Sequence, residues 1–159
     1  MNGRLRISLA LAAALSMAMS VPAAARDVTY RNERFGTVAT FPSEAFREAL
    51  PEPTNGDGRA WRSDNGAELF IYARANAGGE TPASIVRDRA ADDTVTYRRA
   101  GDRWVVVSGF RDGKIFYERY IFRGDVIHSV AIRYPPNLRK TYDRLVGPIT
   151  KTLRVDRSS

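Results

Sequence analysis

Residues 95 to 134 read VTYRRAGDRWVVVSGFRDGKIFYERYIFRGDVIHSVAIRY, and most of the architecture follows from them. This stretch holds four apolar runs, which are separated by Ala100-Gly101-Asp102, Asp112-Gly113 and Gly124-Asp125. Glycine and aspartate at such positions supply the positive φ angles that tight hairpin turns require. The stretch therefore predicts a meander of four antiparallel strands.

Two-residue turns determine which residues of neighbouring strands lie opposite each other. With turns at Asp112-Gly113 and Gly124-Asp125, the opposed pairs are Phe110 with Ile115, Val106 with Arg119, Tyr117 with Ile132, and Ile121 with His128. One face then carries Trp104, Val106, Ser108, Phe110, Ile115, Tyr117, Arg119, Ile121, His128, Val130, Ile132 and Tyr134. The other carries Val105, Val107, Gly109, Phe116, Glu118, Tyr120, Phe122, Ile127, Ser129, Ala131 and Arg133. Both faces are mainly apolar, so each needs a covering layer.

The remaining segments predict further strands and the covering helices. Extended pieces are expected at 28–31 and 35–41, and a hairpin at 59–63 and 67–73 around the turn Asp64-Asn65-Gly66. Together with the meander, these segments predict an α+β fold, in which an antiparallel sheet of about seven or eight strands is sandwiched between helices.

Three helices are expected. Thr81 can cap a helix from Pro82 to about Asp92, because proline is tolerated in the first turn. Ser43 can cap a short helix at residues 44–50. A third pattern has apolar residues at helical spacing over 138–153, where Gly147-Pro148 predicts a kink or two shorter helices.

The first 25 residues have the composition of an export signal. Arg4 and Arg6 precede an apolar run at residues 7–21, and the small side chains Ala23 and Ala25 stand before Arg26. The apolar run is too short to span a bilayer comfortably. We therefore expect cleavage near Arg26, a periplasmic or secreted chain with no stable membrane insertion, and one globular domain at residues 26–159.

Composition excludes several classes of function. The sequence contains no cysteine, which rules out a thiol nucleophile, a thiolate metal site, a lipidated cysteine and disulfides. Without the leader, 23 basic residues face 18 acidic ones, a net charge of +5, and they form no run of five or six. That moderate, scattered charge argues against nucleic acid as a partner. The absence of a GxGxxG or Walker A pattern argues against a nucleotide cofactor.

His128 is the only histidine, so any histidine-dependent catalytic site has to use it. In the predicted register Ser108 shares its face but lies roughly 13 Å away, whereas a nucleophile and its base need about 3 Å. Ser129 and Glu118 point to the opposite face. A packed histidine with a hydrogen-bond partner is the favoured interpretation, and a small hydrolase using His128 is the alternative.

Candidate metal ligands are limited to oxygen donors. One stretch of the sequence is rich in the acidic and amide side chains that bind calcium: Asn55, Asp57, Asp64, Asn65 and Glu68. It lacks the alternating acids of an EF-hand loop. Turn chemistry is the favoured explanation of these residues, and Asp92-Asp93 fits the end of a helix better than a catalytic carboxylate pair. No metal or cofactor is therefore expected.

Charged residues inside the meander are the remaining candidates for a site. Glu118 and Arg133 are diagonal neighbours on one face, which predicts a structural ion pair, and Arg119 lies among apolar side chains on the other. The functional alternative is a partly covered sheet face with a ligand groove lined by Glu118, Arg119, His128 and Arg133. Two further basic spots, Arg98-Arg99 near Arg103 and Arg139-Lys140 with Arg144, could bind phosphate or carboxylate groups, but a solvated surface is the favoured interpretation of both.

A known layout resembles this plan. The pieces that carry the resemblance are residues 30–36 (YRNERFG), Phe41-Pro42 and the closing tyrosine-containing helix. The chain resembles exported proteins of alphaproteobacteria that are similar in layout to the PsbP-like and DcrB-like group, over nearly all of residues 28–155. The resemblance implies an antiparallel sheet between helices and an accessory or binding role without enzymatic activity. It assigns no functional residue.

The sequence thus favours a non-catalytic periplasmic binding or accessory protein, whose partner is an envelope protein or a small ligand. Two alternatives stay open. One is the hydrolase that uses His128, and the other is an electrostatic binder of anionic envelope polymers or lipids.

Overall fold

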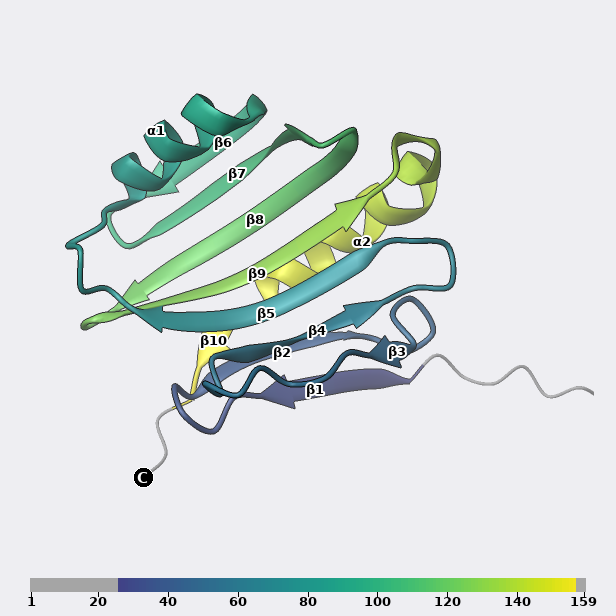
Figure 1. The fold of residues 1–159 in the computed structure, drawn as a ribbon, viewed down its shortest axis with the longest axis horizontal. Helices are drawn as coiled ribbons and strands as arrows, with labels where there is room; N and C mark the ends of the chain where they lie inside the picture. The colour runs from purple at the N-terminus through teal and green to yellow at the C-terminus, as the bar shows by residue number, and fades with distance from the viewer. Residues whose placement is uncertain (1–25, 157–159) are drawn as a thin grey trace, which may run out of the picture.

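The computed structural model describes residues 26–156, and they form an α+β fold (Figure 1). The predicted meander is present as β6 (Thr94–Gly101), β7 (Trp104–Arg111), β8 (Lys114–Arg123) and β9 (Val126–Tyr134). It belongs to a seven-stranded antiparallel sheet that continues through β5 (Glu68–Ala75), β4 (Gly58–Arg62) and β3 (Glu48–Ala49). Strands β6 and β3 form the two edges of this sheet.

A second, three-stranded sheet and two helices complete the fold. The small sheet has the order β1 (Asp27–Arg31), β2 (Thr37–Pro42) and β10 (Arg154–Val155). The helices are α1 (Pro82–Asp92) and α2 (Arg139–Lys151), the latter preceded by the short 3-10 helix η1 (Pro136–Leu138). The predicted leader, with Ala23 and Ala25, lies outside the described residues.

The predicted strand register is confirmed. Each of the four opposed pairs is found, from Phe110 opposite Ile115 to Ile121 opposite His128. Asp112 and Gly113 have φ angles of 50° and 74°, and Gly124 has 55°, which are the values that tight turns need. Every side chain of β7, β8 and β9 therefore lies on the face that the sequence assigns to it.

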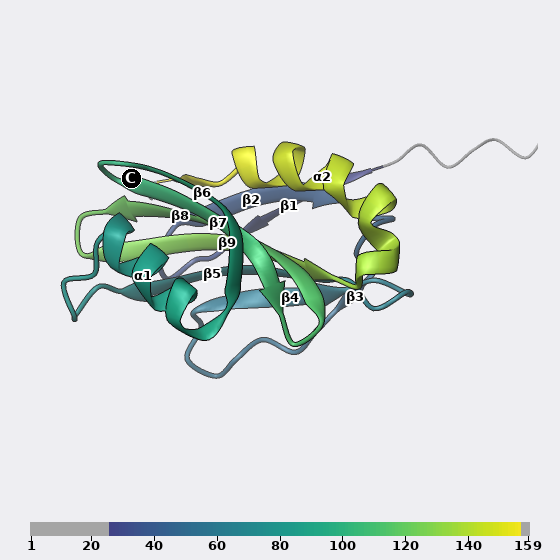
Figure 2. The same cartoon turned by 90° about the horizontal axis from the view of Figure 1, so that it is seen from above.

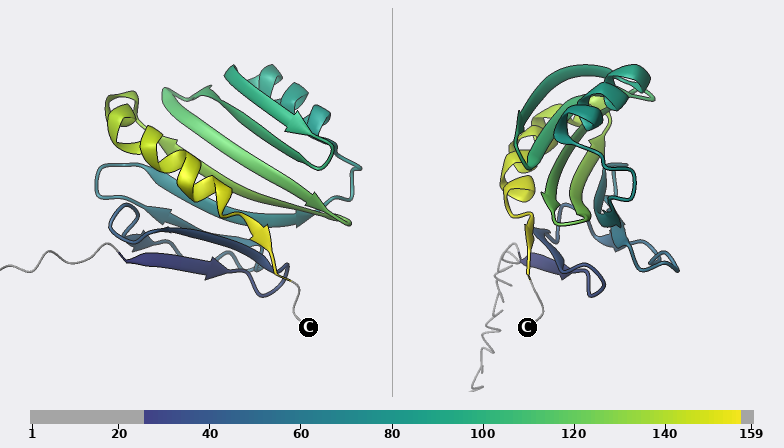
Figure 3. Two further views of the ribbon diagram at one scale, coloured as in Figure 1. Left: turned by 180° about the vertical axis from the view of Figure 1, so that it is seen from behind. Right: turned by 90° about the vertical axis from the view of Figure 1, so that its left-hand side faces the viewer.

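Both faces of the large sheet are covered, as predicted. On one face α1 packs over a cluster formed by Ile85, Val105, Val107, Phe116, Tyr120, Phe122 and Ile127. On the other, α2 and the small sheet enclose a larger core, which includes Phe41, Phe46, Trp61, Leu69, Val130, Ile132, Tyr142 and Ile149. Figures 2 and 3 show the two helices on opposite sides. The small sheet is an unpredicted part of this cover.

The predicted helix at residues 44–50 is wrong. Residues 43–45 form a turn, and Glu48 and Ala49 pair with the β4 residues Arg62 and Trp61 instead. A helix this short gains little on its own. Pairing along β4 satisfies the backbone while Phe46 enters the core with 2 % of its surface exposed.

The other two helices form largely where expected. The capping box of Thr81 and Ser84 starts α1 at Pro82. α2 is one helix rather than two, with Pro148 inside it. Gly147 removes the Cβ that a following proline ring would meet. Val146 and Ile149, on either side, pack into the same core.

Gly109 gives a test of the edge between β6 and β7. A Cβ at this position would overlap the carbonyl oxygen of Thr94, beside the register shift between Val95 and Tyr97. We expect Gly109→Ala to lower the free energy of unfolding by about 1–3 kcal/mol, because backbone has to move. Gly78→Ala is the matched control, since its Cβ would meet nothing within 4 Å. Urea unfolding measures both, and equal stabilities would contradict this packing.

Candidate functional site

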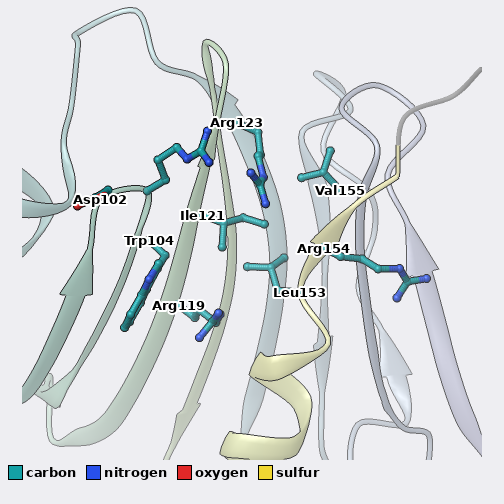
Figure 4. A pocket seen from close by; sticks show the side chains of 9 residues that line it. Asp102, Trp104, Arg119, Ile121, Arg123, Leu153, Arg154 and Val155 are labelled. Carbon is teal, nitrogen blue, oxygen red and sulfur yellow. The ribbon is translucent and has the colours of Figure 1, made fainter.

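A cavity of about 690 Å³ lies between the large sheet and the C-terminal strand β10. We call it the arginine groove; its lining residues are Asp102, Arg103, Trp104, Arg119, Ile121, Arg123, Leu153, Arg154 and Val155. Figure 4 shows its two walls, one with Trp104, Arg119, Ile121 and Arg123, the other with Leu153 and Val155. Arg154 points away from the cavity in this view.

The strand register builds the first wall. Alternate residues of a strand share a face, so β8 presents Arg119, Ile121 and Arg123 in one row. Trp104 on β7 lies opposite Ile121. Arg103 is held next to this row because its carbonyl oxygen accepts a hydrogen bond of 2.9 Å from the backbone N–H of Phe122.

The groove carries unbalanced positive charge. Within residues 26–156, no ion pair includes Arg103, Arg119 or Arg123, whereas Arg154 Nε lies 3.3 Å from Asp156 Oδ1. Asp102 is the one acidic residue in the lining. The groove therefore has three guanidinium groups that no carboxylate of the described chain neutralises.

Arg119 is the most constrained of the three. Its guanidinium lies 5.5 Å from the centre of the Trp104 ring, within the range of a cation–π contact. Its Nε is buried, with no hydrogen-bond partner in the described part of the chain. A buried donor without an acceptor is costly, and a bound carboxylate or phosphate is the kind of acceptor that arginine pairs with best.

The groove continues into a second cavity of about 400 Å³. Arg103, Arg123 and Val155 line both cavities, so they form the boundary between them. The second cavity adds His128 and Arg34, and Arg34 is paired with Asp57 at 2.7 Å. The free guanidinium groups at the boundary are accessible from both sides.

His128 is a packed residue that joins the two sheets. It is 1 % exposed, and its Nδ1 lies 2.7 Å from the hydroxyl oxygen of Thr37 on β2, which is also buried. Burial lowers the pKa of the imidazole, and the charge of Arg123 lowers it further. Among the described residues its hydrogen-bond partner is this threonine and not a carboxylate or serine. His128 thus lacks the serine or carboxylate partner in an open cleft that the hydrolase hypothesis predicts, because its hydroxyl partner Thr37 is fully buried.

The opposite face holds a buried charge cluster under α1. Glu118 is 2 % exposed and accepts hydrogen bonds from Arg89 Nε at 2.6 Å, Arg111 Nη1 at 3.0 Å and the Tyr120 hydroxyl at 2.6 Å. Arg111 also donates to Asp93 at 2.7 Å. Two arginines and two carboxylates thus balance each other, and they attach α1 to the sheet.

The predicted ion pair between Glu118 and Arg133 is wrong. The carboxylate of Glu118 is paired instead with Arg89 on helix α1 and with Arg111 at the end of β7. Arg133 instead lies over the ring of Phe70, 4.8 Å from its centre. Strand register alone does not place a helical side chain, so the sequence analysis missed Arg89.

The four residues of the predicted groove do not form one site. Glu118 and Arg133 lie on the α1 side of the sheet, and Arg119 and His128 lie on the α2 side, where Arg119 lines the arginine groove and His128 lines the second cavity. The sequence analysis did not select Trp104 and Arg123. The signal that would have found Arg123 is the alternation of Arg119, Ile121 and Arg123 on one face of a predicted strand.

Two further features are absent from residues 26–156. No group of three or more histidine, aspartate or glutamate side chains is arranged to hold a metal ion. No helix in this range is long and apolar enough to cross a bilayer.

Comparisons with known proteins support the fold. No protein-family model and no curated protein matches the sequence. The solution structure of cyanobacterial PsbP (CyanoP) from Synechocystis matches with a TM-score of 0.57 at 11 % identity, covering 92 % of this chain and 99 % of its own. A crystal structure from Bacteroides thetaiotaomicron matches with a TM-score of 0.51 at 10 % identity, covering 84 % of this chain and 49 % of its own. The predicted PsbP-like fold is confirmed, and at this identity the likeness concerns the fold alone.

The charge cluster predicts acid sensitivity. Burial alone raises the pKa of Glu118, but the charges and hydrogen bonds of Arg89 and Arg111, with Tyr120, hold it below its ordinary value. The hydrogen bonds and charge of Arg111 lower the pKa of Asp93 in the same way. Depressed carboxylate pKa values stabilise the fold above the ordinary pKa, so this contribution disappears as the pH falls below about 5.

Glu118→Gln tests this contribution. We expect a loss of about 3 kcal/mol in the free energy of unfolding at pH 7, because the half-buried Arg89 and Arg111 lose the buried carboxylate that both contact. The variant should also lose less stability than the wild type between pH 5 and pH 3. Asp88→Asn, which breaks the exposed pair with Arg87, is the control and should cost less than about 1 kcal/mol. Parallel pH curves for wild type and Glu118→Gln would contradict the assignment.

Proposed function

We propose that the protein is a non-catalytic binding protein that holds an anionic ligand in the arginine groove. One observation carries the proposal: Arg103, Arg119 and Arg123 line one cavity, and none has a carboxylate partner in residues 26–156. Cavities of this size are typical of small-molecule sites. The ligand carries carboxylate or phosphate groups, the partners that guanidinium groups recognise.

The non-catalytic part of the proposal rests on His128. Thr37 is fully buried, and His128, although it contributes to the wall of the second cavity, is only 1 % exposed, so a substrate would meet almost none of either side chain. The groove itself is lined by cations and apolar side chains, with Asp102 as its sole acid. Such a lining suits binding better than proton transfer.

An accessory role in the cell envelope is the setting that we propose for this binding. It is supported by the composition of the first 25 residues, which has the features of an export leader. An exported protein meets anionic solutes and lipid head groups but seldom nucleic acid. The proposal therefore joins the binding-protein hypothesis with that of an electrostatic binder.

Titration with tripolyphosphate tests the groove. We expect Arg103→Gln/Arg119→Gln/Arg123→Gln to weaken binding by at least about thirtyfold, because each charge-assisted hydrogen bond is worth about 1.5–3 kcal/mol. Binding to the wild type should also weaken as salt rises towards 1 M, where charges are screened within about 3 Å. Isothermal titration calorimetry measures both effects.

The control variant removes the same charge elsewhere. Arg98, Lys140 and Arg144 are exposed, lie outside the groove and have no ion pair among the described residues. Arg98→Gln/Lys140→Gln/Arg144→Gln should therefore bind tripolyphosphate almost as the wild type does. Equal losses in both triple variants would mean that overall charge attracts the anion, and the groove would lose its assigned role. Vesicles with anionic lipids, tested with the same variants, separate a head-group ligand from a soluble one.

The proposed address has its own test. Expression of the full chain in a bacterium should give a periplasmic protein whose first residue is Arg26, as determined by mass spectrometry. Ala25→Asp should leave the leader attached, because signal peptidase reads small residues at Ala23 and Ala25. Ala24→Gln, at the permissive position between them, should be cleaved normally. An uncleaved wild-type chain in the cytoplasm would refute the address.

A further inference from the structure

We propose that the ligand of the arginine groove is an elongated dianion, with one anionic group at each end and an apolar body between them. This inference rests on the proposed function and specifies its ligand class. It follows from the order in which the groove presents its cationic and apolar side chains.

The row on β8 is basic, apolar and basic. Arg119, Ile121 and Arg123 alternate along one face of the strand. The first and last of them are four residues apart, which separates their Cα atoms by roughly 13 Å. A ligand with two anionic groups spans this separation, whereas one carboxylate or phosphate group reaches both arginines only if their side chains bend towards each other.

The two basic ends differ in character. At the inner end, the Arg119 guanidinium lies against Trp104 and its Nε is buried without an acceptor. At the outer end, Arg103 and Arg123 are both exposed and form the boundary with the second cavity. The inner end thus offers one constrained cation, and the outer end offers two exposed ones.

The middle of the groove is apolar. Ile121 on one wall faces Leu153 and Val155 on the other, and none of these side chains donates or accepts a hydrogen bond (Figure 4). A ligand with polar groups throughout would leave its centre without partners. A hydrocarbon body removes apolar surface from water there instead.

The size of the groove agrees with this order. At about 690 Å³ it is far larger than a single phosphate or carboxylate group. Ligands that fill such sites are held by many apolar contacts and a few placed polar groups. An anion–hydrocarbon–anion molecule fits this division, with its charges at the two places where the wall is cationic.

A series of dicarboxylates tests the inference. Succinate, adipate and azelate carry the same charge and differ in the length of the hydrocarbon between their carboxylates. We expect azelate to bind at least about tenfold more tightly than succinate. Once one carboxylate of azelate is bound, the hydrocarbon chain holds the second carboxylate near the other basic end, so the second contact forms within the same complex. Nonanoate, with the same chain and one carboxylate, is the matched control ligand and should bind more weakly than azelate by a similar factor.

Variants then assign each end. Arg119→Gln should reduce azelate affinity to that of nonanoate, and Ile121→Gln should remove the dependence on chain length while binding of succinate persists. Circular dichroism and urea unfolding check that both variants fold, and Arg98→Gln serves as the control for charge. Titrations by calorimetry or by NMR chemical shifts provide the affinities.

The outcomes separate this inference from the proposed function. Equal affinity for succinate and azelate, or for azelate and nonanoate, would overturn the inference that the ligand is an elongated dianion. Binding of tripolyphosphate would in that case still support an anion site in the groove. Failure of tripolyphosphate and all three dicarboxylates to bind would remove both proposals.

Discussion

Two tight turns, at Asp112-Gly113 and Gly124-Asp125, hold β7, β8 and β9 in a register that assigns each side chain to one of the two layers. Asp112 is the one non-glycine in residues 26–156 with a positive φ angle, so this hairpin depends on a conformation that most residues avoid. A shift of one residue would exchange the two faces completely. Glu118 would then meet the small sheet, and Arg119 would lie under α1.

This register separates two kinds of charge on the same strand. On the α1 side, Glu118 is fully enclosed and is neutralised by Arg89 and Arg111. On the α2 side, Arg119 has an aromatic neighbour and a cavity but no carboxylate. Arg133 also has a buried Nε without a hydrogen-bond partner in residues 26–156. Its guanidinium, however, lies over the ring of Phe70, and Arg133 lines none of the described cavities. The coincidence of free charge and open volume therefore distinguishes Arg119 from Arg133, and the larger volume of the arginine groove, about 690 Å³ against about 300 Å³, distinguishes it from the cavity beside Arg98 and Arg99.

The sequence predicts what local patterns determine. Turn residues and alternation gave the meander, its register and both faces, and the Thr81-Pro82 signal gave the start of α1. Contacts between distant segments escaped prediction. The pairing of Arg154 with Val38 places the chain end beside β2, so the wall of the groove made by Leu153 and Val155 has no local signal. The same holds for Glu48, which pairs with β4 where its own segment predicts a helix. The wall made by β8 was readable from strand alternation, whereas the wall at residues 153–155 required the packing of the two layers.

The groove therefore depends on how firmly the small sheet is attached to the large one. Its two walls belong to different layers, and β10 pairs with β2 through only two residue pairs. The hydrogen bond between His128 and Thr37 is a buried polar contact that fixes the same two layers relative to each other. A neutral imidazole suits this position, since a charged one would lie between the layers next to Arg123. Although His128 lacks the open cleft of a catalytic base, it thus positions the wall opposite Arg119 and Ile121. A ligand that contacts both walls would in turn stabilise the contact between the two layers.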